Sequence, residues 1–504
     1  MTAKSLSIEG GALAVPEPNA GGVRVYKGVP YAAPPVGRLR WRPPEPVQGW
    51  TAVRPSDAFG PNSLQGVVWG DIDPHAEGVS EDCLYLNVWT PATPGDGARL
   101  ATMVWIHGGG FVAGSGAEPR YNGARLAARG VIVVTLNHRL NALGFLAHPE
   151  LTAESDHRAS GNYGFLDLVA ALAWVKRNIA AFGGDPAKVT IAGESAGSFA
   201  ASALMASPLA KGLVAGVIGE SGALFASPAR APASLAEAEA AGVLFMRRAG
   251  AKSLAELRAL PAEAILAAAP WEGFRPIVDG WLLPRSPEEI FAAGEQSDVP
   301  LMAGWNKDEG FNFTLKQGRN ADRAHADLAR EIFGARTDEA LRRYSGGSPE
   351  ADVTSAAALG GDLMIIHPTW AWIEAQKQTG RAEIFRFRFD RAPLTPEGWF
   401  GERPSREAGA FHAGEILYVF DNLDAIPWLT DDADRELARL ASNYWINFVK
   451  NGDPNGPGLP HWPSYRSAGA PVMMLGAPSG AGPEEWRERH EFLRQAGRGG
   501  KDAG

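Results

Sequence analysis

A series of short apolar runs constrains the fold of this chain more than any other feature. Four runs, 84–90, 101–108, 131–139 and 189–195, contain β-branched residues and are bounded by turns, which is typical of strands. Two more, 212–221 and 298–306, are interpreted as further buried strands, and 383–390 alternates as a late strand does. The stretch 164–182, between two of these runs, has apolar residues at helical spacing and ends at two glycines. Because strands alternate with helices, we predict an α/β fold with a mostly parallel central sheet and helices on both faces.

The remaining segments predict one elaborated domain. Residues 229–270 are rich in Ala, with Leu and Glu at helical spacing, and a second helical region covers about 320–380. We interpret both as insertions that form a lid over the sheet. Residues 432–452 predict a final amphipathic helix that ends at glycine. We expect a single domain over residues 1–485, followed by a polar tail, 486–504, that frays.

Composition excludes several classes of partner. The net charge is −9, and acidic and basic residues are mixed without a long basic run, which argues against nucleic acid and anionic membranes. No window approaches the ~18 uninterrupted apolar residues of a membrane span. Cys83 is the single cysteine, so no intrachain disulfide forms, and the first residues contain no run of signal-peptide length. We therefore expect a cytoplasmic protein.

The sequence GESAG at residues 193–197 places Ser195 between two glycines, after a predicted strand and before a predicted helix. This context fits the G-x-S-x-G nucleophile elbow, a sharp turn whose strained backbone needs small neighbours. The alternative is a helix N-cap, in which the hydroxyl of Ser195 only accepts a backbone N–H.

The sequence HGGGF at residues 107–111 also follows a predicted strand. Such a glycine loop exposes backbone N–H groups, and this type is found in esterases and lipases of the α/β-hydrolase fold, where it stabilises an oxyanion. A phosphate-binding or dinucleotide-binding loop would need other spacings, which are absent here. The elbow and the loop together favour a nucleophilic Ser195.

The base and the acid are harder to assign from the residues. In this fold an Asp or Glu and then a His follow the nucleophile. Both Asp308 and Glu309 follow the predicted strand 298–306 and remain candidates for the acid. The candidate bases are His325, His367, His412, His461 and His490. Small residues around His412, in EAGAFHAGE, favour it over the other four.

Motifs along nearly the whole chain resemble those of type B carboxylesterases, the family of bacterial para-nitrobenzyl esterases, animal carboxylesterases and cholinesterases. They include YKGVPYAAPPVGRLRWRPP at 26–44, SEDCLYLNVWTP at 80–91, VWIHGGGF at 104–111, WNKDEGFNF at 305–313 and FHAGEILYVF at 411–420.

The resemblance implies specific roles for individual residues. The implied nucleophile, acid and base are Ser195, Glu309 and His412. The implied oxyanion hole consists of the N–H groups of Gly109, Gly110 and Ala196. Glu194 and Ser221 are implied to support this site, with Ser221 hydrogen-bonded near the acid–base pair. The implied structural ion pairs are Arg40–Glu81 and Arg139–Asp167.

Two departures from the family pattern are visible. Cys83 corresponds to a cysteine that is disulfide-bonded in some members, but the upstream FGPNSLQG lacks the partner, so Cys83 is expected to be a buried, inert thiol. Trp69 does not have the spacing of the choline-binding tryptophan, so a cholinesterase is not expected.

We therefore predict a serine hydrolase that cleaves carboxylic esters through an acyl-enzyme, without a metal or organic cofactor. The expected partner is a small ester with a short-to-medium acyl chain or an aryl group. The candidates for the pocket wall are Phe111, Phe311, Phe313, Trp271 and Phe274. The alternatives are another acyl hydrolase with the same triad (lipase, thioesterase, amidase or lactonase) and a non-catalytic binding module.

Overall fold

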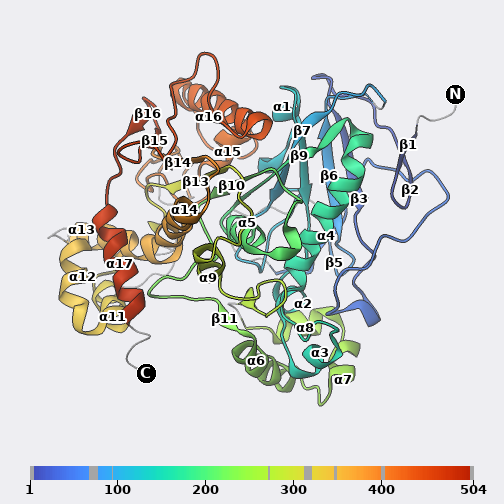
Figure 1. Ribbon diagram of the computed structural model, residues 1–504, viewed down its shortest axis with the longest axis horizontal. Helices are drawn as coiled ribbons and strands as arrows, with labels where there is room; N and C mark the ends of the chain where they lie inside the picture. Colours follow the sequence, from blue (N-terminus) through green and yellow to red (C-terminus); the bar gives the residue numbers. More distant parts are fainter. Residues whose placement is uncertain are drawn as a thin grey trace.

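The computed structural model describes residues 5–66, 78–93, 95–270, 273–311, 321–344, 349–398 and 403–499. A ten-stranded sheet runs through the centre of the molecule (Figure 1). Its strands, in spatial order, are β16 (Gly480–Gly482), β15 (Val472–Leu475), β14 (Ile384–Phe389), β13 (Leu301–Asn306), β10 (Gly216–Glu220), β9 (Gly184–Glu194), β7 (Leu100–Ile106), β8 (Ile132–Leu136), β6 (Tyr85–Thr90) and β3 (Arg24–Pro30).

The seven strands from β15 to β8 are parallel, and antiparallel pairs occur only towards the edges of this sheet, at β16, β6 and β3. This arrangement confirms the predicted α/β class and the mostly parallel sheet. Each of the seven predicted apolar runs overlaps one of its strands, and β7 and β9 begin before the predicted bounds. The carboxyl ends of parallel strands meet at one edge, which is where functional groups gather in such sheets.

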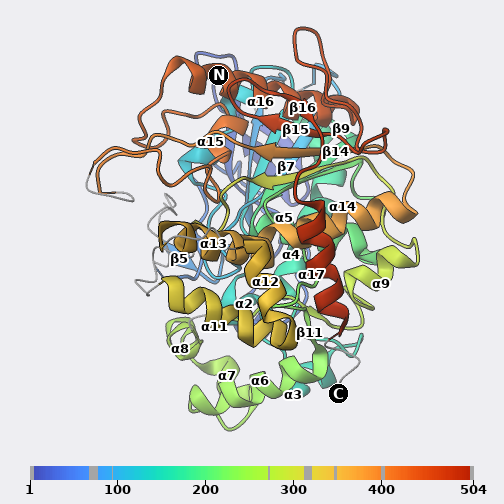
Figure 2. The same ribbon diagram turned by 90° about the vertical axis from the view of Figure 1, so that its left-hand side faces the viewer.

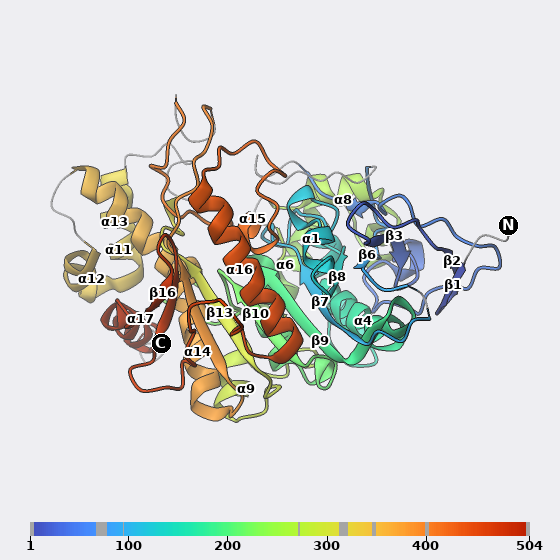
Figure 3. The same cartoon turned by 90° about the horizontal axis from the view of Figure 1, so that it is seen from above.

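Helices cover both faces of the sheet. One face carries α4 (Tyr163–Asn178), α5 (Ala196–Ala206), α9 (Pro287–Ala292) and α14 (His367–Thr379), and the other carries α1 (Ala124–Ala127), α15 (Ile416–Val419) and α16 (Asp432–Asn451). Figure 3 shows α16 lying across the sheet, where it contacts β7 and β9. Alternate residues of β7 enter the two cores: Val104 and Ile106 face one, and Met103 and Trp105 the other.

The predicted insertions are helical. The first consists of α6 (Leu235–Arg248), α7 (Leu254–Ala259) and α8 (Ala262–Ala268), next to the small sheet of β11 (Ala233–Ser234) and β12 (Ile277–Val278). The second consists of α11 (Ala321–Phe333), α12 (Thr337–Tyr344) and α13 (Pro349–Gly361), and a π-helical turn, Asp362–Ile366, joins it to α14. In Figure 2 both insertions lie below the sheet. Their role as a lid stays a prediction.

The chain after residue 485 differs from the frayed tail that we expected. Most of it forms α17 (Arg487–Gly499), in which Phe492 and Leu493 are buried in a small separate core with α11, α12 and α13. Arg489 forms an ion pair of 2.6 Å with the buried Asp362. Although the segment is mostly polar, Phe492 and Leu493 are sufficient to pack one face of α17 against α11, α12 and α13.

The remaining elements are short. They are β1 (Ser5–Ile8), β2 (Gly11–Ala14), β4 (Asn62–Ser63), β5 (Val79–Ser80), α2 (Asn141–Phe145), α3 (Pro149–Glu154) and the 3-10 turns Gly37–Leu39, Pro119–Tyr121, Ile179–Phe182, Pro208–Ala210 and Gly334–Arg336. No helix among the described residues is long and apolar enough to cross a bilayer.

The two expected ion pairs are present. Arg40 Nε lies 2.7 Å from Glu81 Oε1, and Arg139 Nε lies 2.8 Å from Asp167 Oδ2. Cys83 is fully buried, and this burial raises the pKa of its thiol, as expected for an inert cysteine.

Candidate active site

Ser195 lies in the turn between β9 and α5. Its φ of 54° and ψ of −120° are unusual for a non-glycine residue, and such strain is tolerated only where the surrounding structure enforces it. A Cβ on Gly193 would lie 2.6 Å from the Gly197 carbonyl carbon, and one on Gly197 would lie 2.0 Å from Ile106 O. Both glycines are therefore required for the tight turn.

The side chain of Ser195 does not cap the helix that follows it. The residue precedes the first turn of α5, yet its side chain makes no capping hydrogen bond. Its backbone is held instead: Ser195 N donates to Glu220 O at 2.9 Å, and Ser195 O accepts from Phe199 N at 2.9 Å. The side chain is partly exposed, whereas the other residues of the elbow are buried. The turn thus presents the hydroxyl to a reactant.

The glycine loop packs directly on this elbow. A Cβ on Gly108 would lie 2.6 Å from Glu194 Oε2 and 3.3 Å from Ser195 Cβ. Gly109 and Gly110 have φ values of 105° and 61°, so the loop needs glycine at both positions. Within the described part of the chain, no residue accepts a hydrogen bond from the backbone N–H of Gly109, Gly110 or Ala196. These donors are available to a ligand beside Ser195.

One of the five candidate histidines contacts a candidate acid. His412 Nδ1 lies 2.6 Å from Glu309 Oε2, and the Glu309 side chain is fully buried. The second oxygen of Glu309, Oε1, accepts a hydrogen bond of 2.7 Å from Asn306 N. Two contacts thus fix this carboxylate at the end of β13 with one oxygen aimed at the imidazole.

Asp308, the other candidate acid, has a different place. Its Oδ2 accepts a hydrogen bond of 2.8 Å from Ala410 N, and its own N–H donates to Ala410 O at 3.0 Å. Asp308 therefore ties down the loop that carries His412 without touching the ring. The neighbouring acids of the DEG sequence thus separate into one that contacts the imidazole and one that anchors its loop.

The other four histidines lie elsewhere. His325, His367 and His490 are buried on α11, α14 and α17, and His461 is exposed in a loop. His367 and His490 stack with Trp370 in an aromatic cluster. None of these positions is at the carboxyl end of β13.

Three further buried carboxylates surround His412. Glu194 Oε1 lies 3.2 Å from His412 Nε2, and electrostatic interactions connect Glu415 with both Glu194 and Glu309, and Glu220 with both Glu194 and Glu415. Burial raises the pKa of Glu194 to about 8 and, together with Glu309, the pKa of Glu415 to about 7. Burial also raises the pKa of Glu220, whose Oε1 accepts from Trp445 Nε1 at 2.7 Å.

These carboxylates act on His412. Burial alone lowers the pKa of the imidazole, but the adjacent carboxylates of Glu194 and Glu309 outweigh it and raise the pKa above its usual value. Sequence reasoning included Glu194 and missed Glu220 and Glu415. Glu220 directly precedes Ser221, and Glu415 ends the FHAGE sequence at 411–415. This closeness to predicted site residues was the only sequence signal for either glutamate.

The hydrogen bond expected of Ser221 is not present. Ser221 has a φ of 58° and is fully buried, but its hydroxyl has no hydrogen-bond partner among the described residues. Glu309 Oε1, the oxygen that does not contact His412, accepts a hydrogen bond from Asn306 N. The Asn306 side chain donates to Phe411 O at 2.8 Å. Asn306 thus provides the polar support near the acid that the resemblance assigned to Ser221.

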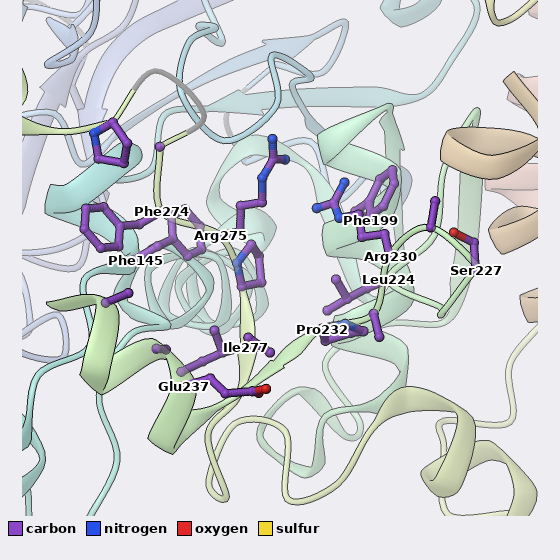
Figure 4. A pocket seen from close by; sticks show the side chains of 18 of the residues that line it. Phe145, Phe199, Leu224, Ser227, Arg230, Pro232, Glu237, Phe274, Arg275 and Ile277 are labelled. Atoms are coloured by element: carbon purple, nitrogen blue, oxygen red, sulfur yellow. The ribbon is translucent and has the colours of Figure 1, made fainter. Parts of the chain in front are cut away.

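A cavity of about 890 Å³ is lined by Phe199, one helical turn after Ser195 (Figure 4). Phe274 is in its wall, as predicted. Phe111 is instead a core residue, 2% exposed, with its ring packed edge-on against Phe145 and Phe165, so its apolar surface is already used. Phe311 does not line this cavity. The other predicted wall residues, Trp271 and Phe313, lie outside the described residues, as does Trp69.

No group of three potential metal-ligating His, Cys, Asp or Glu side chains occurs in the described ranges. The chemistry that the described side chains can perform is that of a hydroxyl, an imidazole, a carboxylate and a set of backbone donors. This combination is suited to acyl transfer.

Comparisons with known proteins identify the family. The model of a family described as the carboxylesterase family matches residues 2–491. A fumonisin B1 esterase of Sphingopyxis macrogoltabida is 38% identical over 92% of this chain and 85% of that protein. A para-nitrobenzyl esterase of Bacillus subtilis is 36% identical over 90% of this chain and 91% of that protein.

Solved structures give the same result. A PNB esterase superposes with a TM-score of 0.82 at 35% identity, covering 98% of this chain and 100% of the other. A Geobacillus stearothermophilus carboxylesterase superposes with a TM-score of 0.83 at 33% identity, covering 97% of this chain and 99% of the other.

Proposed function

This chain belongs to the carboxylesterase family and hydrolyses carboxylic esters, and we propose that Ser195, His412 and Glu309 form its catalytic triad. The observation that carries the proposal is the 2.6 Å contact between Glu309 Oε2 and His412 Nδ1, next to an elbow that holds Ser195 in a strained conformation. A histidine held by a buried carboxylate next to a partly exposed serine is the arrangement that activates a serine nucleophile by removing its proton.

In the first half-reaction, Ser195 Oγ attacks the ester carbonyl while His412 Nε2 takes the hydroxyl proton. Glu309 holds the proton of Nδ1, which fixes the tautomer that leaves Nε2 able to accept. The resulting imidazolium is stabilised by the carboxylate and then protonates the leaving alcohol. The product of this half-reaction is an acyl-Ser195 ester.

In the second half-reaction, water takes the place of the alcohol. His412 removes a proton from the water, which attacks the acyl carbon, and the Ser195 oxygen leaves with the proton that His412 returns. We propose that the N–H groups of Gly109, Gly110 and Ala196 hold the oxyanion of both tetrahedral intermediates. The first turn of α5 adds a favourable dipole at the same point.

The proposed substrates are small esters with a short-to-medium acyl chain or an aryl group. Support comes from relatives named para-nitrobenzyl esterase, fumonisin B1 esterase and cocaine esterase, whose names all refer to ester cleavage. A cavity of about 890 Å³ is within the usual size range for small-molecule sites.

We also propose that the protein acts in the cytoplasm. The support is its cysteine usage: the 504 residues contain one cysteine, which is buried, so the chain has no internal disulfide of the kind that is common in oxidising compartments. Fractionation of the native cells, with detection of the protein by antibody, tests this location.

The hydrolysis of p-nitrophenyl butyrate tests the proposed function. We expect Ser195→Ala to retain the circular dichroism spectrum and to lose turnover by roughly 10⁴-fold or more, because no other group can carry the acyl intermediate. Ser198→Ala, in the same helix, is the matched control and should retain most of the turnover. If Ser195→Ala retains turnover within a few-fold of the wild type, the proposed triad is wrong.

A further inference from the structure

The cavity begins one helical turn from the proposed nucleophile. Phe199, in its wall, is one helical turn after Ser195, and Leu224 follows β10 on the neighbouring strand. On the opposite side, Gly273 approaches the glycine loop so closely that an added Cβ would lie 2.4 Å from Val112 Cγ1. A group attached to an ester at Ser195 can therefore extend into this cavity.

Most of the cavity wall is apolar. The large side chains in it are Phe145, Phe199, Leu224, Phe225, Phe245 and Ile277. An apolar wall of this kind is expected in an esterase that takes uncharged acyl or aryl groups. The charged residues in the same wall are therefore the unusual feature.

Three arginines line the cavity, Arg230, Arg248 and Arg275, and two of them, Arg230 and Arg275, lie at the same end of a small sheet. The parallel pairing of β11 with β12 places Ala233 opposite Ile277. Arg230 and Arg275 precede these paired residues by three and two positions, so the register brings them together although 45 positions separate them in the sequence. In Figure 4 both side chains point to the side of Phe199, away from Glu237.

The positive charge at Arg230 is not balanced by an acid. No described carboxylate forms an ion pair with this guanidinium, which lies 5.3 Å from the centroid of the Phe199 ring. Burial and the nearby charge of Arg275 lower the pKa of Arg230 to about 10. A cation that is partly buried beside another cation is destabilised, and a bound anion would remove that cost.

A hydroxyl accompanies this charge. Ser227 and Arg230 close a tight turn through two backbone hydrogen bonds, Ser227 N to Arg230 O at 2.7 Å and Arg230 N to Ser227 O at 3.1 Å. Ser227 is 9% exposed and lines the cavity, but its Oγ has no hydrogen-bond partner in the described structure. This hydroxyl is therefore available to donate a hydrogen bond to a ligand in the cavity.

The single acid among the described residues of the wall is already engaged. Glu237 Oε2 accepts hydrogen bonds from Ser234 N at 2.8 Å and from Ser234 Oγ at 2.6 Å as part of the capping box of α6. It is exposed, and in Figure 4 it lies at the end of the cavity opposite to Arg230. No acid in the described wall therefore lies beside Arg230.

From the proposed function we infer, in addition, that Arg230, Arg275 and Ser227 form a subsite for a carboxylate, so that the preferred substrates are esters that carry a free carboxylate group. The planar guanidinium of Arg230 matches a carboxylate with two N–H donors, Arg275 adds a second positive charge and Ser227 Oγ donates a third hydrogen bond. The apolar wall accommodates the chain between this carboxylate and the ester.

Two pairs of esters test the inference, one for each half of the substrate. The first pair is mono-p-nitrophenyl adipate and its uncharged isostere p-nitrophenyl 6-methylheptanoate, which place the carboxylate or an isopropyl group on the acyl half. The second pair is 4-carboxybenzyl butyrate and 4-isopropylbenzyl butyrate, which place it on the alcohol half. The measured quantity is the ratio of kcat/KM for the charged and uncharged members of each pair.

We expect the wild type to prefer the charged member of at least one pair. Arg230→Gln and Arg275→Gln should each lower that ratio by roughly 10–100-fold, the usual effect of removing a charge-assisted hydrogen bond. Arg230→Lys should retain part of it. Arg247→Gln removes an exposed arginine of α6 outside the cavity wall, and it should leave the ratio unchanged.

The pair that responds identifies which half of the ester enters the cavity. An absent preference in the wild type, or a preference that survives in both glutamine variants, overturns the carboxylate subsite. The uncharged esters separate this result from the proposed function: their hydrolysis without a charge preference contradicts the subsite alone, whereas no turnover of any of the four esters contradicts the esterase assignment.

Discussion

Two buried clusters of charged residues in this molecule differ in their charge balance. Arg139 and Asp167 bury one positive and one negative charge together, with 2.6 Å between Arg139 Nη2 and Asp167 Oδ1 and side-chain exposures of 3% and 0%. Around His412, the carboxylates of Glu194, Glu309 and Glu415 are buried close to a single imidazole, and Glu220 is buried beside Glu194 and Glu415.

This difference in charge balance corresponds to a difference in role: the first cluster stabilises the fold, and the second is proposed to take part in the reaction. The balanced pair leaves no charge to respond to a ligand, so it only joins the loop after β8 to α4. Burial and mutual repulsion in the unbalanced cluster raise the pKa values of Glu194 and Glu415, and its carboxylates raise the pKa of His412; such perturbed pKa values are typical of functional sites. Charge balance, rather than burial, distinguishes a structural cluster from a functional one here.

The largest effect should come from the acid of the unbalanced cluster. We expect Glu309→Gln to lower kcat for p-nitrophenyl butyrate by roughly 10³–10⁴-fold. The amide NH₂ would donate to His412 Nδ1 and force the ring proton onto Nε2, where it blocks removal of the serine proton. Steady-state kinetics with thermal unfolding as a check on folding measure this.

Asp308→Asn is the matched control for that variant. An asparagine at this position can still accept from Ala410 N, and its own N–H still donates to Ala410 O, so we expect a loss below about 10-fold. An equal loss in the two variants would remove the distinction between the acid that contacts the ring and the acid that anchors its loop.

The balanced pair should affect stability in place of rate. Asp167→Asn leaves the buried charge of Arg139 without its counter-charge and should lower the free energy of unfolding by about 3–5 kcal/mol. Urea titration measures this, and kcat of the folded fraction should change little. Asp424→Asn removes the exposed partner of Arg125 and should cost no more than about 1 kcal/mol. A similar cost for both variants would contradict the comparison.

A smaller effect is expected from Glu194, in the pH profile. The reaction needs neutral His412, so kcat/KM falls as the pH decreases through the pKa of the imidazole, which Glu194 at 3.2 Å raises. Glu194→Gln removes that negative charge, so the acidic limb of the profile should move to lower pH by about one unit. The exposed Glu436→Gln should not move it. A limb that stays in place or moves to higher pH in Glu194→Gln would show that Glu194 does not act on the base.

Much of the sheet could be predicted because its signal is local. The β-branched runs that became β7, β8 and β9 are bounded by turn residues, and buried parallel strands have this composition. The packing of α17 could not be predicted in this way. Its burial depends on Phe492 and Leu493 meeting the separate core of α11, α12 and α13, a contact that no local pattern records.

The site divides in the same way. GESAG alone left a nucleophile and a helix N-cap open, and HGGGF favoured the nucleophile; the steric limits on Gly193 and Gly197 come partly from Ile106 on β7. Asp308 and Glu309 are adjacent and equally polar, so only the resemblance favoured Glu309 before its contact with His412 was known. The nearness of Arg230 to Arg275 follows from the register of β11 and β12 and is invisible in the sequence.

Labelling with a fluorophosphonate tests the central claim most directly, because this reagent reacts only with a serine that its surroundings have activated. We predict one adduct per chain, located at Ser195 by peptide mass analysis, absent in Ser195→Ala and formed much more slowly in Glu309→Gln. Hydrolytically active protein that gains no adduct, or gains it at another residue, would contradict the account.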